Sequence, residues 1–265
     1  MAGVSMGKPA VVERVYILDG GTARVDDASI YSPGFNVGRP MTLCCNVYLI
    51  RHRGEWMVWD TGTQDDLIDE PAGRIIAHGI RGTVGKTIAS QLAEIGVDPA
   101  NVSTLAISHA HYDHVGNCRL FPNAKWIAQK AEYDAMFGSD PGTYGYRPEL
   151  YESLRQNETV VIEGDYDVFG DGAVRIISTP GHTPGHCSLM VNLPESGPTL
   201  LSGDVAHNRR NFRCRCVPSF NVDVLKSVAS MGRVDALIED EGATLWINHD
   251  IDQNATLPHA PQWIT

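Results

Sequence analysis

Short apolar stretches and one clear helical period divide the chain into predicted strands and helices. The apolar residues gather in short runs that end at Gly, Pro or Asp, which is typical of buried strands. Such runs predict strands at residues 11–18, 46–51, 55–60, 105–107, 125–128, 160–162, 174–178, 189–193, 199–201 and 245–247. Val84, Ile88, Leu92 and Ile95 keep to one helical face and predict a helix over residues 84–95. Two further helices are predicted at residues 129–137 and 221–241.

Turn and loop residues interrupt this pattern in several places. Asp19-Gly20-Gly21 predicts the turn that ends the first strand, and Arg53-Gly54 predicts a hairpin between the next two. Residues 22–42, which contain Pro33-Gly34, predict a long loop of the kind that is often functional. Aromatic side chains are concentrated in residues 133–151, either as a helical insertion packed on the core or as an apolar wall for a substrate. Spacing does not separate these two interpretations.

Length and charge narrow the class of protein. With 265 residues and 43% hydrophobic content, the chain can bury a large core, and we expect one domain over residues 1–265. The formal net charge of -11 supplies no obvious basic face, so we expect no nucleic-acid and no membrane partner. Residues 1–10 lack an apolar core of signal-peptide length, and no apolar run approaches a membrane span. These features predict a cytoplasmic protein.

The six cysteines follow no recognised zinc spacing. Two pairs are adjacent or one residue apart, Cys44 with Cys45 and Cys214 with Cys216. We expect reduced and mostly buried thiols rather than disulfides in such a chain.

Four potential metal ligands occur within six residues, directly after the predicted strand at 105–107. They are His109, His111, Asp113 and His114. Unpaired polar groups are costly at a buried strand end, so these side chains need a common partner. Neutral imidazole and carboxylate are usual ligands of zinc, and a strand-to-helix turn can aim several of them at one point. A surface loop that is rich in His and Asp by chance is the alternative, and the spacing disfavours it.

Three further candidates also follow predicted strands. His182 lies in Thr179-Pro180-Gly181-His182, Asp204 ends Ser202-Gly203-Asp204, and His249 comes after the strand at 245–247. Two strand-rich halves covered by helices, with all candidate ligands at one edge, predict layers in the order helix, sheet, sheet, helix.

The order His109-x-His111-x-Asp113-His114, His182, Asp204, His249 resembles the metallo-β-lactamase superfamily over essentially the whole chain. The resemblance implies an α+β protein, a four-layer αββα sandwich with a dinuclear metal site. On this pattern the first metal is held by His109, His111 and His182, the second by Asp113, His114 and His249, and Asp204 bridges them. Zinc is the default expectation, and the same ligands accept cobalt, manganese or iron. Asp60 is expected to orient a ligand imidazole. Ordinary structural or surface roles are expected for His52, His78, His186 and His259, although His186 is close enough to His182 in the sequence to support that ligand.

Particular positions favour one branch of this superfamily. True β-lactamases of this fold lack the bridging Asp, and the flavin-linked diiron members carry Glu where His111 stands. The Tyr48-Leu49-Ile50 strand that leads to Asp60-Thr61-Gly62, and the terminal Asn248-His249-Asp250, are similar to N-acyl homoserine lactonases. The resemblance implies a quorum-quenching hydrolase that opens the lactone ring by attack of a metal-bridging hydroxide. It also implies Asp113 as proton donor to the leaving oxygen and a homodimer as a compatible assembly, and Tyr112, inside the motif, is an expected contact for the substrate.

One residue departs from the lactonase pattern. Many such lactonases carry a Tyr three residues after the bridging Asp, directed at the substrate carbonyl, and here His207 stands there. An imidazole can donate a hydrogen bond to the developing oxyanion and exchange protons. Alternatively, His207 supports other side chains or faces solvent, and the sequence leaves both roles open.

Two rival functions remain. A hydrolase of another small lactone, or of a thioester in the manner of glyoxalase II, uses the same metal site. The glyoxalase kind is expected to carry a basic C-terminal helical region, whereas only 16 residues follow His249. A protein of a different class, one that carries metal and binds a ligand without catalysis, is disfavoured by the complete ligand set.

Overall fold

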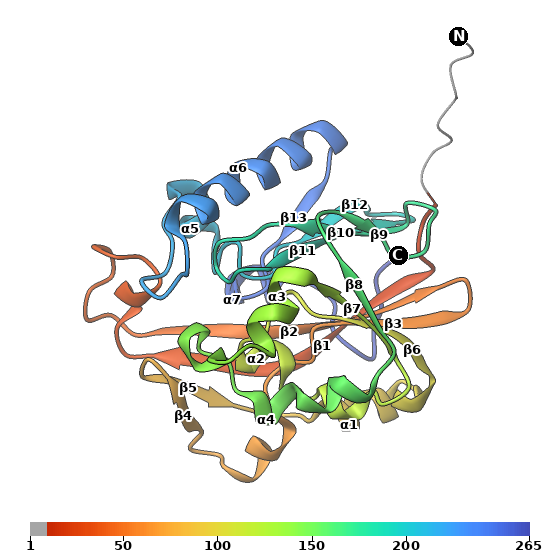
Figure 1. Ribbon diagram of the computed structural model, residues 1–265, viewed down its shortest axis with the longest axis horizontal. Helices are drawn as coiled ribbons and strands as arrows, with labels where there is room; N and C mark the ends of the chain where they lie inside the picture. Colours follow the sequence, from red (N-terminus) through yellow and green to blue (C-terminus); the bar gives the residue numbers. More distant parts are fainter. Residues whose placement is uncertain (1–9) are drawn as a thin grey trace.

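The computed structural model describes residues 10–265, and the residues 1–9 considered above lie outside the described part. Two β-sheets stack face to face (Figure 1). The eight-stranded sheet has the order β4-β5-β1-β2-β3-β6-β7-β8, and the five-stranded sheet the order β13-β12-β11-β10-β9. The strands of the larger sheet are β1 Arg14–Val25, β2 Met41–His52, β3 Glu55–Trp59, β4 Arg74–Ala77, β5 Ile80–Thr83, β6 Val102–Ala106, β7 Lys125–Gln129 and β8 Thr159–Ile162. Those of the smaller sheet are β9 Tyr166–Asp167, β10 Val174–Ser178, β11 Cys187–Leu193, β12 Gly197–Leu201 and β13 Thr244–Trp246.

Helices cover the outer face of each sheet. The α-helices are α1 Ile88–Glu94, α2 Tyr112–Val115, α3 Lys130–Met136, α4 Pro148–Tyr151, α5 Arg209–Cys214, α6 Val224–Glu241 and α7 Ile251–Asn254. In Figure 1, α6 and α5 lie along the five-stranded sheet, and α1 and α4 lie on the far side of the eight-stranded sheet. The predicted αββα sandwich is therefore confirmed.

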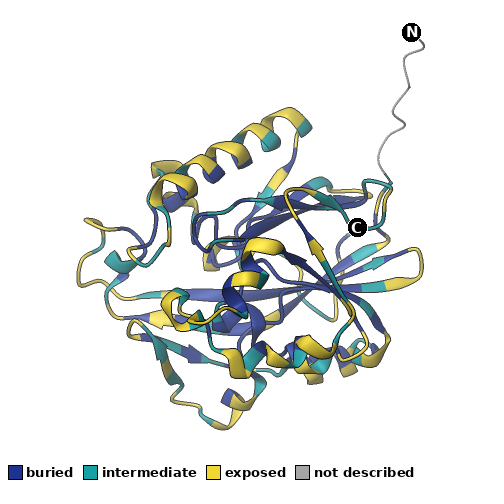
Figure 2. Cartoon of the chain, viewed as in Figure 1, coloured by how far each residue is buried: buried dark blue, intermediate teal, exposed yellow. Residues whose placement is uncertain are grey.

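The main core lies between the sheets. It is built from apolar side chains of β1 to β3 and of β10 to β12, including Ile17, Tyr48, Trp59, Ile176, Leu189 and Leu201. On β2, Tyr48 faces this core while Leu49 faces α1 on the other side, so both faces of the strand are buried. Burial on both faces explains why these strands form nearly continuous apolar runs in the sequence. Figure 2 shows the same arrangement, with buried strands inside and exposed residues along the outer faces of the helices.

Helix α6 follows the predicted pattern with one exception. Its first turn is capped by the Asp223 side chain, which accepts from the Lys226 amide, and Gly242 ends it in the left-handed region. Met231 packs in the core beneath the helix, whereas Val224, which the period placed on the apolar side, is 52% exposed. Val224 is the first residue of the helix and precedes the turns that contain its buried residues, Ser227, Ser230, Met231 and Val234.

The first strand does not end at the diglycine, contrary to the predicted turn. β1 runs to Val25, and its pairing with β2 shifts register between Asp19 and Thr22, as at a β-bulge. A Cβ at Gly20 would lie 2.4 Å from the Cys45 carbonyl oxygen, so glycine allows this close approach. The predicted long loop is thus shorter than 22–42, since β2 begins at Met41.

Two other parts of the topology differ from the prediction. Residues 160–162, like 174–178, were expected to belong to a second set of strands in the C-terminal half, but β8 pairs in parallel with β7 at the edge of the larger sheet. The β4–β5 hairpin was not predicted, because its short strands carry mixed polar and apolar residues. The hairpin at Arg53-Gly54 is confirmed by the antiparallel pairing of β2 and β3.

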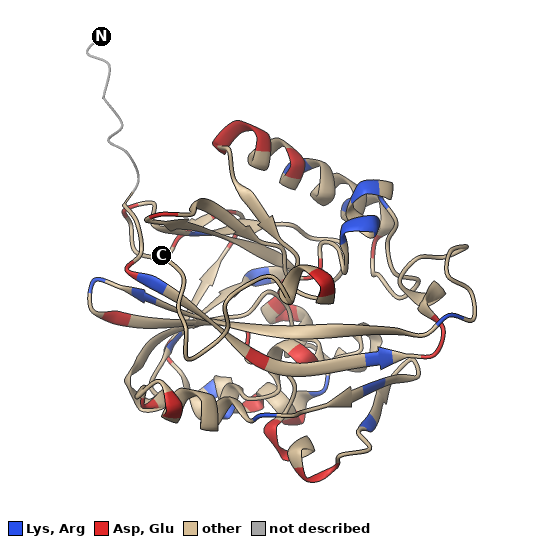
Figure 3. Cartoon of the chain, turned by 180° about the vertical axis from the view of Figure 1, so that it is seen from behind, with Lys and Arg blue, Asp and Glu red and all other residues tan. Residues whose placement is uncertain are grey.

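Charged residues are distributed unevenly over the surface. Seen from behind, Lys and Arg form one local group at α5, and acidic residues gather at the end of α6 (Figure 3). Within residues 10–265, every helix is too short or too polar to cross a lipid bilayer.

Candidate metal centre and substrate pocket

The turn after β6 supplies four of the seven predicted ligands. β6 ends at Ala106, and the short helix α2 begins three residues after His109, so the loop and the helix turn their side chains toward one point. The amide of Thr61 donates to the His114 carbonyl at 2.7 Å, and that of Gly116 to the Gly62 carbonyl at 2.8 Å. These bonds fix α2 against the end of β3. A Cβ at Gly116 would lie 2.3 Å from the Gln64 amide nitrogen, so only glycine permits this approach.

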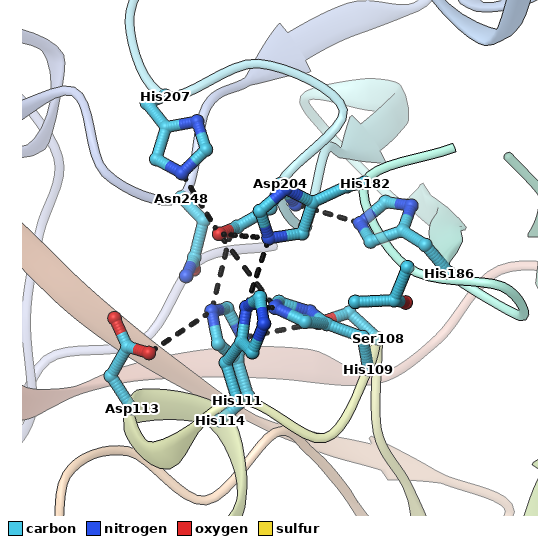
Figure 4. Close-up of polar contacts among 12 residues, drawn as sticks. Ser108, His109, His111, Asp113, His114, His182, His186, Asp204, His207 and Asn248 are labelled. Carbon is cyan, nitrogen blue, oxygen red and sulfur yellow. Dashed lines mark hydrogen bonds and ion pairs between the residues drawn. The ribbon is translucent and has the colours of Figure 1, made fainter. Parts of the chain in front are cut away.

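One group of ligands forms around His111. Its Nδ1 lies 2.9 Å from His109 Nε2 and 3.0 Å from His182 Nε2. Asp204 Oδ2 lies 3.3 Å from His182 Nε2 and 3.8 Å from His109 Nε2. Figure 4 shows these side chains converging from the β6–α2 loop, the 179–186 loop and the end of β12.

A second group shares Asp204 with the first. Asp204 Oδ1 lies 2.9 Å from His249 Nε2 and 3.2 Å from His114 Nε2. Asp113 completes the group, with Oδ1 at 3.9 Å from His114 Nε2 and Oδ2 at 3.7 Å from His249 Nε2. The structure therefore brings all seven predicted ligands together, and Asp204 lies between the two groups with one oxygen toward each.

Each of the five ligand imidazoles has one ring nitrogen, the outer one, hydrogen-bonded to a group that surrounds the site. The other ring nitrogen, the inner one, points toward the centre. The partners are Ser108 Oγ for His109, the Tyr144 carbonyl for His111, Asp60 Oδ2 for His114, Asn221 Oδ1 for His182 and the Cys44 carbonyl for His249. Carbonyl and carboxylate oxygens accept only, so at those positions the outer nitrogen carries the proton. The inner nitrogen is then free to bind a cation.

Burial and charge together favour a cation at the centre. Burial opposes ionisation of Asp204, yet the imidazoles of His249 and His114 hold the pKa of its carboxyl well below the usual range. Burial lowers the pKa of His114, but Asp204 and Asp60 outweigh it and raise that pKa to about 10. A group of carboxylates in a buried site stabilises positive charge, which is carried by protons or by divalent cations.

Two buried atoms at the centre make no hydrogen bond of acceptable geometry, although they lie 3.2 Å from each other. They are His114 Nε2 and Asp204 Oδ1. An unsatisfied buried polar atom is costly, and a metal ion between these two atoms would satisfy both. The donor set, all imidazole nitrogen and carboxylate oxygen, fits divalent zinc and related ions.

A cavity of about 390 Å³ opens beside the ligands. Its lining combines ligand residues with parts of the β4–β5 hairpin, of residues 133–151 (the aromatic insertion) and of the segment before α6. The lining residues are Tyr31, Ala77, His78, Ile80, His111, Tyr112, Asp113, Gly142, Thr143, Tyr144, Gly145, Asp204, His207, Phe220 and His249. Both predicted substrate contacts, Tyr112 and His207, are therefore at the pocket.

His207 is 2% exposed, so it does not face bulk solvent. Its Nε2 lies 3.1 Å from Asp204 Oδ2, and its ring is 4.8 Å from the ring of Tyr31. The Tyr112 hydroxyl is buried without a hydrogen-bond partner. His207 Nδ1 is likewise buried without a partner, so each of these two pocket-lining residues has one unpaired polar atom.

His186 supports Asp204 rather than His182. Its Nε2 accepts from the Asp204 amide at 2.8 Å, while Nδ1 donates to the Thr179 carbonyl at 2.9 Å. Burial lowers the pKa of His186 to about 4, which matches a neutral ring that donates on one side and accepts on the other.

Some residues of the aromatic insertion pack on the core, as one interpretation of the sequence predicted, and another forms part of the pocket wall, as the other predicted. Tyr146 and Tyr151 are buried in the core, whereas Tyr144 lines the pocket. Each of the two interpretations therefore holds for part of the segment.

Several residues of the site were missed by the sequence analysis. Glu132 is buried on α3 and accepts from the Ala110 and Gly185 amides and from the Tyr146 and Thr183 hydroxyls. It ties the metal loop to the 179–186 loop. His78 was assigned an ordinary role but stacks on Phe220 at the pocket, with ring centroids 5.1 Å apart. Neither residue has a local sequence signal, because their partners come from distant segments.

Comparison with known proteins agrees with this geometry. The family model described as the metallo-beta-lactamase superfamily matches residues 43–244. The chain belongs to this superfamily. Membership in the metallo-beta-lactamase superfamily, together with the His and Asp cluster, indicates divalent metal binding.

Within the metallo-beta-lactamase superfamily, the predicted resemblance to lactonases is also confirmed. The chain is 32% identical over 260 residues to the N-acyl homoserine lactonase AttM of Rhizobium radiobacter, covering 94% of this chain and 98% of the relative. A solved N-acyl homoserine lactone hydrolase with N-hexanoyl-L-homoserine bound at its catalytic metal centre superposes with a TM-score of 0.84 at 26% identity, covering 96% of this chain and 100% of the other. A Bacillus thuringiensis AiiA variant with N-decanoyl-L-homoserine at its active site gives the same TM-score, 0.84, at 26% identity and the same coverage, 96% and 100%.

Proposed function

We propose that this protein is a dinuclear metal-dependent hydrolase that opens the lactone ring of N-acyl homoserine lactones, and so quenches quorum sensing. The observation that carries the proposal is the convergence of seven ligands on two adjoining points beside a pocket, with Asp204 between them. The relatives named as lactonases, which match over nearly the whole chain, support the same substrate class.

We assign His109, His111 and His182 to one metal ion and Asp113, His114 and His249 to the other, with Asp204 shared. Two such ions supply a hydroxide near neutral pH and polarise the carbonyl that it attacks. Zinc is the metal proposed, because nitrogen donors outnumber oxygen donors in this set.

Two side chains of the pocket have assigned roles in ring opening. His207 lines the cavity beside Asp204, where an imidazole N–H can donate to the carbonyl oxygen as charge develops on it. Asp113 lines the same cavity, where its carboxylate would take the proton of the attacking hydroxide and pass it to the ring oxygen as the C–O bond breaks. Overall, one water molecule adds across the ester bond, and the product is an N-acyl homoserine.

The remaining lining fits an acyl chain. Ile80, Phe220 and Tyr144 come from three separate segments and give the cavity apolar walls. Tyr112 lines the same cavity, and its unpartnered hydroxyl can donate to the amide carbonyl oxygen of the substrate.

The test is proton release on adding acyl homoserine lactones to the zinc-loaded protein. We expect rapid ring opening that is lost in His109→Ala and retained in His259→Ala, since His259 lies outside both ligand groups. A panel of thioesters, phosphodiesters and β-lactams serves as comparison. Turnover of a thioester or of another lactone, with no turnover of any acyl homoserine lactone, would replace the proposed substrate by one of the rivals. A metal-replete protein that binds lactones without opening them would support the non-catalytic alternative.

A further inference from the structure

A cysteine thiol lies beside the second group of ligands, at a position outside the superfamily pattern described above. Cys45 is on β2, is 1% exposed and has its Sγ 3.6 Å from Asp113 Oδ2. Ligand atoms of Cys45, Asp113 and His249 all lie within 4.8 Å of one another. The second group therefore contains a sulfur donor as well as nitrogen and oxygen.

The spacing matches shared coordination. With zinc bonds of about 2.3 Å to sulfur and 2.0–2.2 Å to oxygen, tetrahedral ligands S and O are about 3.6 Å apart. The separation between Cys45 Sγ and Asp113 Oδ2 is 3.6 Å, and that between Asp113 Oδ2 and His249 Nε2 is 3.7 Å. The ligand atoms of Cys45 and His249 also lie within 4.8 Å of each other, so the three side chains surround a space in which one cation can lie.

The adjacent cysteine provides an internal comparison. Successive side chains of a strand point to opposite faces, and Cys44 directs its Sγ at the Asn248 carbonyl, 3.4 Å away. Cys44 belongs to neither group of candidate ligands. The two neighbouring thiols therefore differ in orientation while sharing a strand and burial.

We propose that Cys45 is a ligand of the second metal ion and binds it as a thiolate. The inference rests on the proposed dinuclear site. The S–H bond breaks as the sulfur–metal bond forms, and the proton passes to solvent. A thiolate is a softer ligand than carboxylate or imidazole, so it biases the second position toward zinc and cobalt and against manganese. The alternative is that Cys45 only donates a weak S–H hydrogen bond to Asp113.

Cobalt spectroscopy separates these interpretations. The full-length protein is loaded with Co(II), and its absorption is compared with that of Cys45→Ser and the matched control Cys44→Ser. We expect a sulfur-to-cobalt charge-transfer band in the near ultraviolet for the wild type and Cys44→Ser, and its loss in Cys45→Ser. The visible d–d bands, which report cobalt bound by nitrogen and oxygen, persist in all three.

Each other outcome contradicts a defined part of the proposal. If the d–d bands appear in the wild type without the charge-transfer band, Cys45 is not a ligand although the metal site stands. If the wild type shows no d–d bands at all, the proposed metal site and the role of Cys45 are both overturned. X-ray absorption at the zinc edge of the unmodified protein is a second test, independent of how well Cys45→Ser folds. A sulfur neighbour at about 2.3 Å supports the proposal, and a shell of nitrogen and oxygen alone contradicts it.

Discussion

The Nδ1 atom of His114 donates a hydrogen bond of 2.8 Å to Asp60 Oδ2, and both side chains are completely buried. Asp60 is at the end of β3, with a backbone φ of 59° in the left-handed region that a non-glycine residue seldom adopts. The other carboxylate oxygen accepts from the Ser108 amide at 2.6 Å. Asp60 thus connects the end of β3 to the loop that follows β6, the neighbouring strand in the sheet, and fixes the ring of His114, a proposed ligand.

Removing this carboxylate should weaken metal binding without removing a ligand. We expect Asp60→Ala to lower the affinity for the second metal ion by about 10- to 100-fold, and Asp60→Asn by less, because the amide oxygen still accepts. Competition with a chelator measures the affinity. Asp26→Ala, on an exposed side chain, serves as control and should change nothing. Equal affinities in Asp60→Ala and the wild type would show that the ring of His114 needs no such support.

His207 should affect the rate of ring opening more than the metal content. We expect His207→Phe to lower kcat by about 10²- to 10³-fold, because it removes a donor to the developing oxyanion while it keeps an aromatic ring beside Tyr31. His207→Tyr restores a donor and should recover part of the rate. Metal analysis of both variants should give the wild-type content. A loss of bound metal in His207→Phe would instead assign this imidazole to metal binding.

Phe220 should control the preference for acyl-chain length. The half-buried ring lines the cavity, so Phe220→Ala removes apolar contact with the acyl chain. Loss of contact with two methylene groups costs about 1.6 kcal/mol, which corresponds to a rise in KM of about 15-fold for a ten-carbon chain. The KM of a four-carbon chain should hardly change. Phe35→Ala, outside the cavity, is the control, and an equal rise for both chain lengths would contradict this wall for the acyl chain.

Glu132 should contribute strongly to stability. Burial raises the pKa of its carboxyl, and four donors from three segments offset that cost in part. Glu132→Ala leaves these donors without an acceptor, so we expect the free energy of unfolding to fall by about 3 kcal/mol or more. Urea denaturation measures the change. Asp134→Ala, an exposed site on the same helix, should change it by less than about 1 kcal/mol. Similar values for both variants would rule out the special role of Glu132.

His186 should make the fold sensitive to mild acid. Burial lowers its pKa to about 4 in the folded state, against about 6.5 in an unfolded chain. Between these values the unfolded state binds the proton and the folded state does not, so stability is fully present above about pH 6.5 and falls as the pH drops toward 4. The full effect is about 3 kcal/mol.

Urea denaturation at pH 7.5 and pH 5, with chelator present throughout, measures this dependence. His186→Gln retains one donor and one acceptor but does not titrate, so the difference between the two pH values should shrink. The same pH dependence in the variant and the wild type would assign the acid sensitivity to other groups.

Local sequence signals were sufficient for most elements of the core. The apolar runs of β2, β3, β6, β10 and β11 identify strands because the helix and sheet layers bury both faces of the central strands. At Gly20-Gly21, by contrast, the local sequence signal led to a wrong prediction. Gly-Gly predicts a turn when only neighbours are considered, but here the absence of side chains allows β1 to pass close to the Cys45 carbonyl and continue. The partner that decides between turn and bulge is distant in the sequence.

Strand assignment was similarly limited. The residues of β8 were recognised as a strand, but which sheet they join depends on the parallel pairing with β7. The periodicity of a strand does not show which strand it pairs with, so the assignment of residues 160–162 to the second set was wrong.

The sequence by itself determined the ligand types, their order and the strand ends that carry them, because His and Asp at a buried strand end require a cation. It therefore determined the family and the layered fold. Only the tertiary structure decided which atoms meet: that Asp204 presents one oxygen to each group, that Glu132 joins two loops, and that Cys45 rather than Cys44 faces Asp113. Ligand identity is a property of single residues, whereas coordination, pocket walls and supporting hydrogen bonds depend on distances between segments that are remote along the chain.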